Sequence, residues 1–352
     1  MPRVRVMMVD DSAFVRRVIG RMLAEDPDIE LAGTAVNGLE ALEKIVEVKP
    51  DVIVLDVEMP VMDGLETLRR LMQTRPVPVV MLSALTQAGS RTTLEALALG
   101  AVDFITKPAN PAELPLVTNE LAAKVKTAAT ISLRNVVQRG ARLGDALQRN
   151  GFRPRELLGE GRRELVVIGC STGGPVALQA IIPSLPADFP AGVVVVQHMP
   201  VGFTVALADY LAKRSIIKIK HATGEEPVSP GQVLIAPSGY DLYFNGRPGK
   251  ATVKVVAGTN PAPPGAFRPS VDKVMVSAAQ LYGHKVLGVL LTGMGRDGAL
   301  GMQEIKRNKG RTIAEAEESC VVFGMPKAAI ELGAVDKVVP LREIAQEIIN
   351  EL

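Results

Sequence analysis

The sequence predicts an α/β fold built from two open, doubly wound parallel-sheet domains. Short apolar runs alternate with longer amphipathic helical patterns along both halves of the chain, which is typical of parallel strands covered by helices on both faces. A stretch without this rhythm separates the two halves. The length of 352 residues also fits two domains, since a domain usually takes about 150 residues.

The first half, residues 1–124, contains five strand–helix units. Apolar runs predict strands at 4–9, 29–35, 51–55, 77–82 and 101–104. Helical periodicity follows each of them, at 15–25, 39–48, 64–73, 91–99 and 113–124. Because the units alternate without interruption, they predict one open parallel sheet with helices on both of its faces.

Residues 125–163 are predicted to be a linker, since they carry glycine, arginine and proline without a sustained apolar stripe. Their excess of arginine over acidic residues would also suit a nucleic-acid-binding arm, but a solvated tether is favoured. The alternation resumes at 164–352, which predicts a second α/β domain with a loop at 261–269. Its strands fall at 165–168, 193–196, 232–236, 241–244, 252–256 and 285–291, and its helices at 202–213, 271–282 and 299–308, before a strand, helix, strand and helix close the chain.

The composition excludes several classes of function. A formal net charge of +2 gives no strong field for binding nucleic acid. The two cysteines lie far apart and there are three histidines, so neither a disulfide framework nor a cysteine- or histidine-built metal centre is expected. No apolar run approaches the ~20 residues of a membrane span, and the first residues lack the features of a signal peptide. The chain is therefore expected to be soluble and cytoplasmic.

Five polar residues follow four of the strands predicted in the first domain. Asp10 and Asp11 follow the first strand, Asp56 the third, Ser83 the fourth and Lys107 the fifth. Because the carboxyl ends of parallel strands meet at one edge of a sheet, these side chains are expected to lie close together. Crowded carboxylates favour a hard divalent cation such as Mg²⁺. Asp56 is then a candidate nucleophile for phosphate, with Ser83 and Lys107 as partners of the phosphoryl oxygens.

Each of these residues also has an ordinary structural interpretation. Asp11 and Ser12 precede a predicted helix and would cap it well. Lys107 stands before a proline, which is usual in a turn. Their joint placement at strand ends is what favours the functional interpretation.

Ser171 lies in a turn that is typical of nucleophilic serines. The strand 165–168 runs into Gly169-Cys170-Ser171-Thr172-Gly173, which matches the G-x-S-x-G pattern between a strand and a helix. The N-terminus of the following helix would help to stabilise an oxyanion. A glycine-rich phosphate-binding turn is the alternative. Cys170 is a second candidate nucleophile, but its position before Ser171 favours packing inward.

A serine nucleophile needs a base, and the three histidines are the candidates. His198 follows the apolar run 193–196, at the sheet edge where Ser171 is expected. His221 follows the segment IKIK, and His284 precedes a strand rather than following one. His198 is therefore favoured over His221 and His284.

An acid at the same edge would orient the imidazole and stabilise its charged form. Asp297 lies in the turn TGMGRDG after the strand 285–291, where it would also serve as a helix cap. Asp241 and Asp272 are weaker candidates. The order Ser–His–Asp along the chain differs from the Ser–Asp–His order of α/β-hydrolases, which argues against an ordinary lipase or esterase.

Residues 1–124 resemble a two-component receiver domain through VDDS, LDVEMPVMDG, Ser83-Ala84 and Lys107-Pro108. The resemblance implies a flavodoxin-like sheet and phosphorylation of Asp56 by a histidine kinase. It implies that Mg²⁺ is held by Asp10, Asp11, Asp56 and the carbonyl of Glu58. It also implies that Ser83 and Lys107 sense the phosphoryl group, that Phe104 is an aromatic switch residue rather than an ordinary core residue, and that the Lys107–Pro108 bond is cis.

The C-terminal half resembles the catalytic domain of the chemotaxis protein-glutamate methylesterases, the CheB family. The matching segments are IGCSTGGP, VVVVQHMP, FRPSVD and LLTGMGRDGA. The resemblance implies a Rossmann-like esterase domain that needs no cofactor. Ser171 would be the nucleophile, His198 the general base and Asp297 the supporting acid. Backbone N–H groups of Thr172 and Met294 would form the oxyanion hole.

Taken together, the two resemblances imply a response regulator whose output is an esterase. Its substrates would be glutamate γ-methyl esters, and selected glutamines, on the cytoplasmic helices of chemotaxis receptors. A chemotaxis histidine kinase would donate the phosphoryl group, and neither nucleic acid nor a membrane would be a partner. A DNA-binding response regulator is the main alternative, but it would need a compact helical output with a basic face. A non-catalytic phosphate-binding module is the second alternative.

Overall fold

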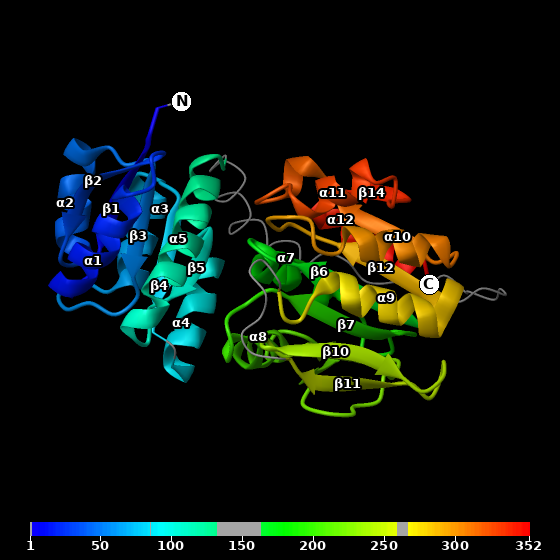
Figure 1. Ribbon diagram of the computed structural model, residues 1–352. Helices are drawn as coiled ribbons and strands as arrows, with labels where there is room; N and C mark the ends of the chain where they lie inside the picture. Colours follow the sequence, from blue (N-terminus) through cyan, green and yellow to red (C-terminus); the bar gives the residue numbers. More distant parts are fainter. Residues whose placement is uncertain (1, 85, 132–162, 259–266) are drawn as a thin grey trace. The chain divides into compact units, whose positions relative to one another are not determined.

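The computed structural model describes residues 2–84, 86–131, 163–258 and 267–352. The chain divides into two compact units, with the division at residue 142, and each unit carries its own parallel sheet (Figure 1). Most of the predicted linker, 132–162, and most of the predicted loop at 261–269 lie outside the described residues. No helix in the described ranges combines the length and the apolar character that crossing a membrane requires.

The first unit is a five-stranded parallel sheet with the order β2-β1-β3-β4-β5. Its strands are β1 (Val4–Val9), β2 (Ile29–Ala35), β3 (Val52–Asp56), β4 (Val79–Ser83) and β5 (Asp103–Thr106). Its helices are α1 (Ala13–Ala24), α2 (Gly38–Val48), α3 (Gly64–Thr74), α4 (Gln87–Ala98) and α5 (Leu114–Ala129), with a 3-10 turn η1 (Pro111–Glu113). Helix α1 packs with α5, whereas α3 packs with α2 and α4, so both faces of the sheet are covered. The predicted doubly wound fold is confirmed, with the flavodoxin-like strand order.

Helix α5 is longer than the sequence pattern predicted. The predicted helix ended at residue 124, but the structure continues it to Ala129. Val117, Leu121, Val125 and Ala128 are all buried, so the apolar stripe of the helix runs past the predicted end at helical spacing. The first five residues of the predicted linker therefore belong to this helix.

The second unit is a seven-stranded parallel sheet with the order β14-β13-β12-β6-β7-β9-β8. Its strands are β6 (Leu165–Cys170), β7 (Gly192–Gln197), β8 (Lys218–His221), β9 (Gln232–Ile235), β12 (Val286–Leu290), β13 (Arg311–Glu315) and β14 (Lys337–Val339). Strands β10 (Tyr240–Asn245) and β11 (Thr252–Ala257) form a separate antiparallel hairpin. The strand order reverses at β6, whose neighbours are β12 and β7. Open parallel sheets usually bind ligands at such a reversal.

Helices cover both faces of this second sheet as well. They are α7 (Gly174–Ile181), α8 (Phe203–Ala212), α9 (Val271–Tyr282), α10 (Ala299–Arg307), α11 (Met325–Glu331) and α12 (Leu341–Asn350), with 3-10 turns η2 (Ile182–Ser184), η3 (Gly283–Lys285) and η4 (Glu317–Ser319). Helix α10 packs with α9 and α11, and α7 packs with α8 and α12. Strand β8 was not predicted, because it is a short edge strand whose alternate residues are exposed.

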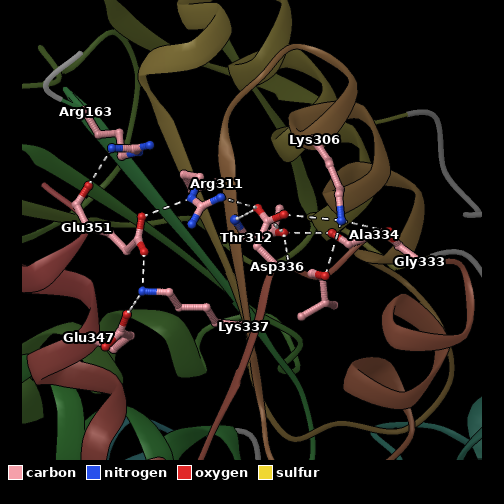
Figure 2. Close-up of polar contacts among 11 residues, drawn as sticks. Arg163, Lys306, Arg311, Thr312, Gly333, Ala334, Asp336, Lys337, Glu347 and Glu351 are labelled. Carbon is pink, nitrogen blue, oxygen red and sulfur yellow. Dashed lines mark hydrogen bonds and ion pairs between the residues drawn. The ribbon is translucent and has the colours of Figure 1, made fainter. Parts of the chain in front are cut away.

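Charged side chains tie the start of the second unit to its last helix (Figure 2). Arg163 Nη1 donates a hydrogen bond of 2.9 Å to the carbonyl oxygen of Glu351. The Glu351 carboxylate pairs with Arg311 Nε at 3.2 Å and with Lys337 Nζ at 2.6 Å, and Lys337 also pairs with Glu347. The end of α12 is thereby held to β13, β14 and the segment that enters β6.

Glu351→Gln is expected to lower the free energy of unfolding by about 1 kcal/mol at neutral pH. The Glu351 side chain is 9% exposed, but Arg311 and Lys337 are 40% and 42% exposed, so solvent screens the pairs. Burial alone would raise the pKa of Glu351, but Lys337 and Arg311 outweigh burial and lower it. A carboxyl group whose pKa is lower in the folded than in the unfolded protein stabilises the fold at pH values above that pKa. The difference in the free energy of unfolding between the two proteins should therefore shrink as the pH falls through the pKa of Glu351.

Calorimetry of both proteins from neutral to acidic pH measures this difference. Glu331→Gln is the matched control, because Glu331 pairs with Lys327 at 3.9 Å and both side chains are mostly exposed. The control should unfold like the parent protein. Equal effects of the two substitutions would show that the cluster at Glu351 adds no stability.

Candidate active site

The first polar cluster lies at the carboxyl edge of the sheet in the first unit. Lys107 Nζ lies 2.7 Å from Asp56 Oδ2 and 2.8 Å from Asp10 Oδ2. The backbone N–H of Lys107 donates to the carbonyl of Ser83, which fixes Lys107 beside the end of β4. Asp10 and Asp56 are buried and Asp11 is exposed. The strand ends have thus brought the predicted carboxylates and the lysine together.

The three carboxylates form a set of ligands that suits a hard cation. Asp10, Asp11 and Asp56 each offer an oxygen, and these oxygens lie within 4.8 Å of one another. Burial, and then the charge of Asp10, raise the pKa of Asp56 to about 6, although Lys107 and the N–H of Glu58 oppose this rise. A divalent cation would relieve the same repulsion, so the donor set fits Mg²⁺.

Two further predicted residues are buried in this unit. The Ser83 hydroxyl accepts a hydrogen bond of 2.8 Å from the Thr93 hydroxyl. It can donate to the carbonyl oxygen of Ala84 or of Gly89, each at 3.4 Å. Phe104 is 2% exposed and packs in the core, with Lys124 Nζ 5.5 Å from the centre of its ring.

The structure tests two further predictions about this cluster, the helix cap at Asp11 and Ser12 and the cis bond at Lys107–Pro108. Ser12 accepts a hydrogen bond from the N–H of Val15 and caps α1, so the capping role belongs to Ser12 rather than Asp11. The expected cis bond at Lys107–Pro108 was wrong. Within the described ranges the cis peptide bond is Arg268–Pro269.

The second cluster begins at the turn between β6 and α7, which carries Ser171. The Ser171 N–H donates to the carbonyl of Thr292 at 3.0 Å, and the N–H of Gly174 donates to the Ser171 carbonyl at 2.8 Å. Gly173 has a φ of +80°, which side chains rarely adopt. A Cβ at Gly174 would lie 2.1 Å from Gln197 Oε1. Glycine is therefore required at both positions for this turn to form.

His198 and Asp297 meet at the same edge of the sheet. The N–H of His198 donates to the carbonyl of Cys170 at 3.0 Å, which sets His198 beside the residue before Ser171. His198 Nε2 lies 2.9 Å from Asp297 Oδ2. His198 Nδ1 is buried without a hydrogen-bond partner among the described residues. The hydrogen bonds of those residues do not include one from the Ser171 hydroxyl to this ring.

Asp297 is held as a carboxylate by donors from the start of α9. Its Oδ1 accepts hydrogen bonds from Ser270 Oγ at 2.9 Å and from the N–H of Asp272 at 3.0 Å, and its Oδ2 accepts from the N–H of Val271 at 2.7 Å. Burial alone would raise the pKa of Asp297, but His198 and these backbone donors outweigh burial and hold the pKa at about 2. Asp297 is therefore ionised at neutral pH, and Nε2 of His198 must carry a proton toward it.

The alternative residues have other partners. His221 Nε2 hydrogen-bonds to Thr204 at 3.0 Å, and His284 lies in the 3-10 turn η3. Asp241 pairs with Lys273 at 3.1 Å. The carboxylate of Asp272 instead caps α10, accepting from the N–H groups of Gly298 and Gly301. Asp272, at the start of α9, thus caps α10, and Asp297, just before α10, caps α9.

Cys170 does not compete with Ser171 for the role of nucleophile. It is fully buried at the end of β6 and donates to Gln197 Oε1 at 3.0 Å. Burial raises the pKa of its thiol, so the thiolate does not form near neutral pH.

Gln197 is a residue of this site that the sequence reasoning missed. Its Nε2 donates hydrogen bonds of 2.9 Å to the carbonyls of both Ser171 and His198. One buried side-chain amide therefore fixes the distance between the backbone carbonyls of the two residues. The available signal was a polar residue at the end of the otherwise apolar run GVVVVQ.

Glu315, a second residue that the sequence reasoning missed, holds the start of the loop that carries Asp297. Glu315 is fully buried on β13, and its carboxylate accepts a hydrogen bond of 2.8 Å from the N–H of Thr292. Thr292 Oγ1 in turn donates to the carbonyl of Thr172 at 3.0 Å. A Cβ at Gly293 would lie 2.9 Å from the Cβ of Ser171. Of the predicted oxyanion residues, Thr172 therefore lies within the serine turn and Met294 follows the glycine that packs against it.

Comparison with known protein families gives a match in each unit. Residues 166–348 match the family model described as CheB methylesterase. Residues 6–119 match the model described as response regulator receiver domain.

Similar proteins match over nearly the whole chain. The protein-glutamate methylesterase/protein-glutamine glutaminase 1 of Carboxydothermus hydrogenoformans is 48% identical over 349 residues, covering 99% of this chain and 99% of the relative. The protein-glutamate methylesterase/protein-glutamine glutaminase of Archaeoglobus fulgidus is 48% identical over 350 residues, covering 99% and 98%. The solved CheB methylesterase catalytic domain of Thermotoga maritima is 44% identical, with a TM-score of 0.52, and covers 54% of this chain and 99% of that domain.

These matches confirm both resemblances found in the sequence. They also agree with the folds of the two units and with the order of the units along the chain. The protein belongs to the CheB family of protein-glutamate methylesterases/protein-glutamine glutaminases, with a response regulator receiver domain preceding its esterase domain.

Proposed function

We propose that this enzyme hydrolyses glutamate γ-methyl esters, and deamidates selected glutamines, on the cytoplasmic helices of chemotaxis receptors. Ser171 is the nucleophile, His198 the general base and Asp297 the supporting acid. The observation that carries the proposal is the 2.9 Å contact between His198 Nε2 and Asp297 Oδ2, beside the turn that holds Ser171. The names of the relatives, which give both reactions, support the two substrate classes.

Acylation begins when His198 takes the proton of the Ser171 hydroxyl. Nε2 is committed to Asp297, so the lone pair that accepts the proton is on Nδ1. Ser171 Oγ then attacks the ester carbonyl carbon and forms a tetrahedral intermediate. The imidazolium, stabilised by the ionised Asp297, returns its proton from Nδ1 to the departing methoxide, and methanol leaves. With a glutamine substrate, the leaving group is ammonia.

Deacylation repeats the sequence with water as the nucleophile. His198 removes a proton from water, which attacks the acyl carbonyl, and the imidazolium then protonates Ser171 Oγ as it leaves. The product is a glutamate side chain. In both halves, negative charge develops on the carbonyl oxygen, and the N–H groups of Thr172 and Met294 are the proposed donors to it. Helix α7 begins at Gly174, directly after the serine turn, and the positive end of its dipole would add to this stabilisation.

The proposed receiver domain, residues 1–124, controls this site through the proposed linker 125–163, and the catalytic domain occupies 164–352. Asp56 accepts a phosphoryl group from a chemotaxis histidine kinase. When bound by Asp10, Asp11, Asp56 and the Glu58 carbonyl, Mg²⁺ supplies neutralising charge for this transfer. Lys107 pairs with the phosphoryl oxygens, and Ser83 and Phe104 respond to the new group. The close contacts of Lys107 with Asp56 and Asp10 support these roles.

We expect the unphosphorylated receiver domain to restrain the esterase. A fragment of residues 139–352 should release methanol faster than the unphosphorylated full chain, by at least roughly fivefold, and should ignore a phosphoryl donor. Asp56→Asn should fold, keep the low basal rate and ignore the donor as well. Initial rates of the three proteins at equal concentration, with and without the donor, measure this. A folded fragment slower than the unphosphorylated full chain would overturn the restraint.

Asp297→Asn is expected to lower turnover by about 10³–10⁴-fold without unfolding the protein. An asparagine can present its NH₂ group to Nε2 and so favour the wrong tautomer of His198. Asp241→Asn is the matched control, since Asp241 was the other acid considered and pairs with Lys273. Methanol release by both variants is compared with the parent. An unchanged rate in Asp297→Asn would reduce Asp297 to a helix cap.

Methanol release from methylated receptor fragments, with and without a small phosphoryl donor, tests the function as a whole. Release that the donor increases is expected. A serine-reactive covalent probe should label Ser171 at the same time. If the protein neither labels nor releases methanol, the glycine-rich turn is better explained as a non-catalytic phosphate-binding site.

A further inference from the structure

The imidazole of His198 lies against an aromatic ring that no catalytic role requires. The ring of Phe267 stacks on it with a distance of 4.0 Å between the ring centres and an angle of 7° between the planes. The His198 side chain is 4% exposed, whereas Phe267 is 43% exposed. Phe267 is therefore not an ordinary core residue, because much of its surface faces solvent while its face covers the proposed base.

The segment 267–270 contacts both partners of the His198–Asp297 pair. Phe267 stacks on His198, and three residues later Ser270 Oγ donates a hydrogen bond of 2.9 Å to Asp297 Oδ1. The segment is itself held at two points. The carbonyl of Arg268 accepts a hydrogen bond of 3.0 Å from the N–H of Gly239, and Ser270 caps α9. The ring of Phe267 thus stands on a fixed backbone rather than on a free loop.

We propose that Phe267 is a positioning residue for His198, which keeps the imidazole in the plane that directs Nε2 to Asp297 and Nδ1 toward Ser171. The proposal rests on the function proposed above. Nδ1 makes no hydrogen bond with the described residues, so the hydrogen bond at Nε2 does not by itself fix rotation of the ring about its Cβ–Cγ bond. A stacked ring blocks this rotation, since any other imidazole plane would collide with its face.

The stack would also attract the imidazolium that forms when His198 takes the serine proton. An aromatic face carries negative charge density and attracts a cation that lies over it. His198 becomes a cation only after it takes the serine proton, so this attraction is stronger in the transition state than in the ground state. An interaction of that kind raises kcat and leaves KM unchanged. Phe267 needs no contact with the substrate for this effect.

Steady-state kinetics of the full chain tests the proposal through three variants. Phe267→Leu keeps an apolar side chain but removes the aromatic face, and kcat should fall about tenfold with KM unchanged. Phe267→Tyr keeps the face and should restore the parent kcat. Tyr240→Leu is the matched control, because Tyr240 is also 43% exposed and belongs to the same unit. An unchanged kcat in Phe267→Leu, or an effect on KM alone, would overturn the positioning role.

Nitrogen NMR of the three histidines gives a readout that does not depend on activity. With ¹⁵N-labelled histidine, long-range proton–nitrogen spectra show which ring nitrogen carries the proton, and His198→Gln identifies the His198 signals. The parent and Phe267→Tyr should show one His198 tautomer, with the proton on Nε2. Phe267→Leu should show averaging between tautomers, because a ring that rotates away from Asp297 loses the partner that holds the proton on Nε2. The same single tautomer in Phe267→Leu would overturn the proposal.

The two failures can be told apart. If Ser171→Ala keeps its esterase activity, the proposed function fails whatever the spectra show. If Ser171→Ala is inactive and Phe267→Leu has the parent kcat and tautomer, the function stands and the role of Phe267 falls.

Discussion

Replacing Ser171 by alanine is expected to abolish methanol release, with a fall in turnover on the order of 10⁶-fold. In the proposed mechanism the Ser171 hydroxyl forms the acyl bond, so binding and oxyanion stabilisation alone would remain in the variant. The turn itself should persist, because Ser171 is held by hydrogen bonds of its backbone N–H and carbonyl, and its side chain makes none with the described residues. Initial rates on methylated receptor fragments measure the loss.

Two controls separate loss of the nucleophile from loss of the fold. Phosphorylation of Asp56 in the Ser171→Ala protein should be normal, since Asp56 lies in the other unit. Ser184→Ala, at the end of η2, should keep the parent rate, because the Ser184 hydroxyl contacts only the carbonyl of Ala180 in the described part of the chain. Esterase activity near the parent level in Ser171→Ala would remove Ser171 from the mechanism and reopen the assignment of the nucleophile.

His198→Gln is expected to cost nearly as much, since members of a catalytic triad act as a unit and their effects do not add. Glutamine keeps a polar side chain of similar length but cannot take and return a proton. In the proposed mechanism, only a neutral imidazole can accept the proton of Ser171, and no side chain is left to do so in the variant. Asp297, with its pKa at about 2, stays ionised across the neutral range and should add no step to the rate–pH profile there.

His221→Gln and His284→Gln are the matched controls for this experiment. Burial lowers the pKa of His221, and its ring hydrogen-bonds to Thr204, so its loss should affect local packing rather than turnover. His284 lies in a 3-10 turn away from the carboxyl ends of the strands. Complete rate–pH profiles of the three variants decide the assignment. A well-folded His284→Gln protein without activity, beside an active His198→Gln protein, would move the role of base to His284.

The clusters at the strand ends were predictable because each of their members is identified by the strand that directly precedes it. In a parallel sheet, every strand ends at the same edge, so residues that follow different strands are brought together whatever their distance in sequence. Asp10, Asp56 and Lys107 meet in this way, although more than 40 residues separate each from the next. Ser171 and His198 follow adjacent strands, β6 and β7, which pair from end to end.

Other features depended on how side chains pack, and local pattern carries little information about that. Helix α5 ends at Ala129 because Val125 and Ala128 find partners in the core of the first unit. The edge strand β8 exists because β9 supplies its hydrogen bonds. In both cases the deciding contacts come from other parts of the chain, and propensity alone does not reveal them.

The sequence by itself determined the two α/β units, the family and the residues at each strand end. Only the tertiary structure decided which nitrogen of His198 faces Asp297, because a ring orientation depends on every group around it. The same holds for Gln197, which joins the carbonyls of Ser171 and His198, and for Phe267, whose ring stacks on His198. Except for the bond between the neighbours Gln197 and His198, these contacts link residues from strands and loops that are far apart in the sequence. They form only when the backbone has already brought those segments within a few ångströms, so they follow from the fold and are not encoded in any one segment.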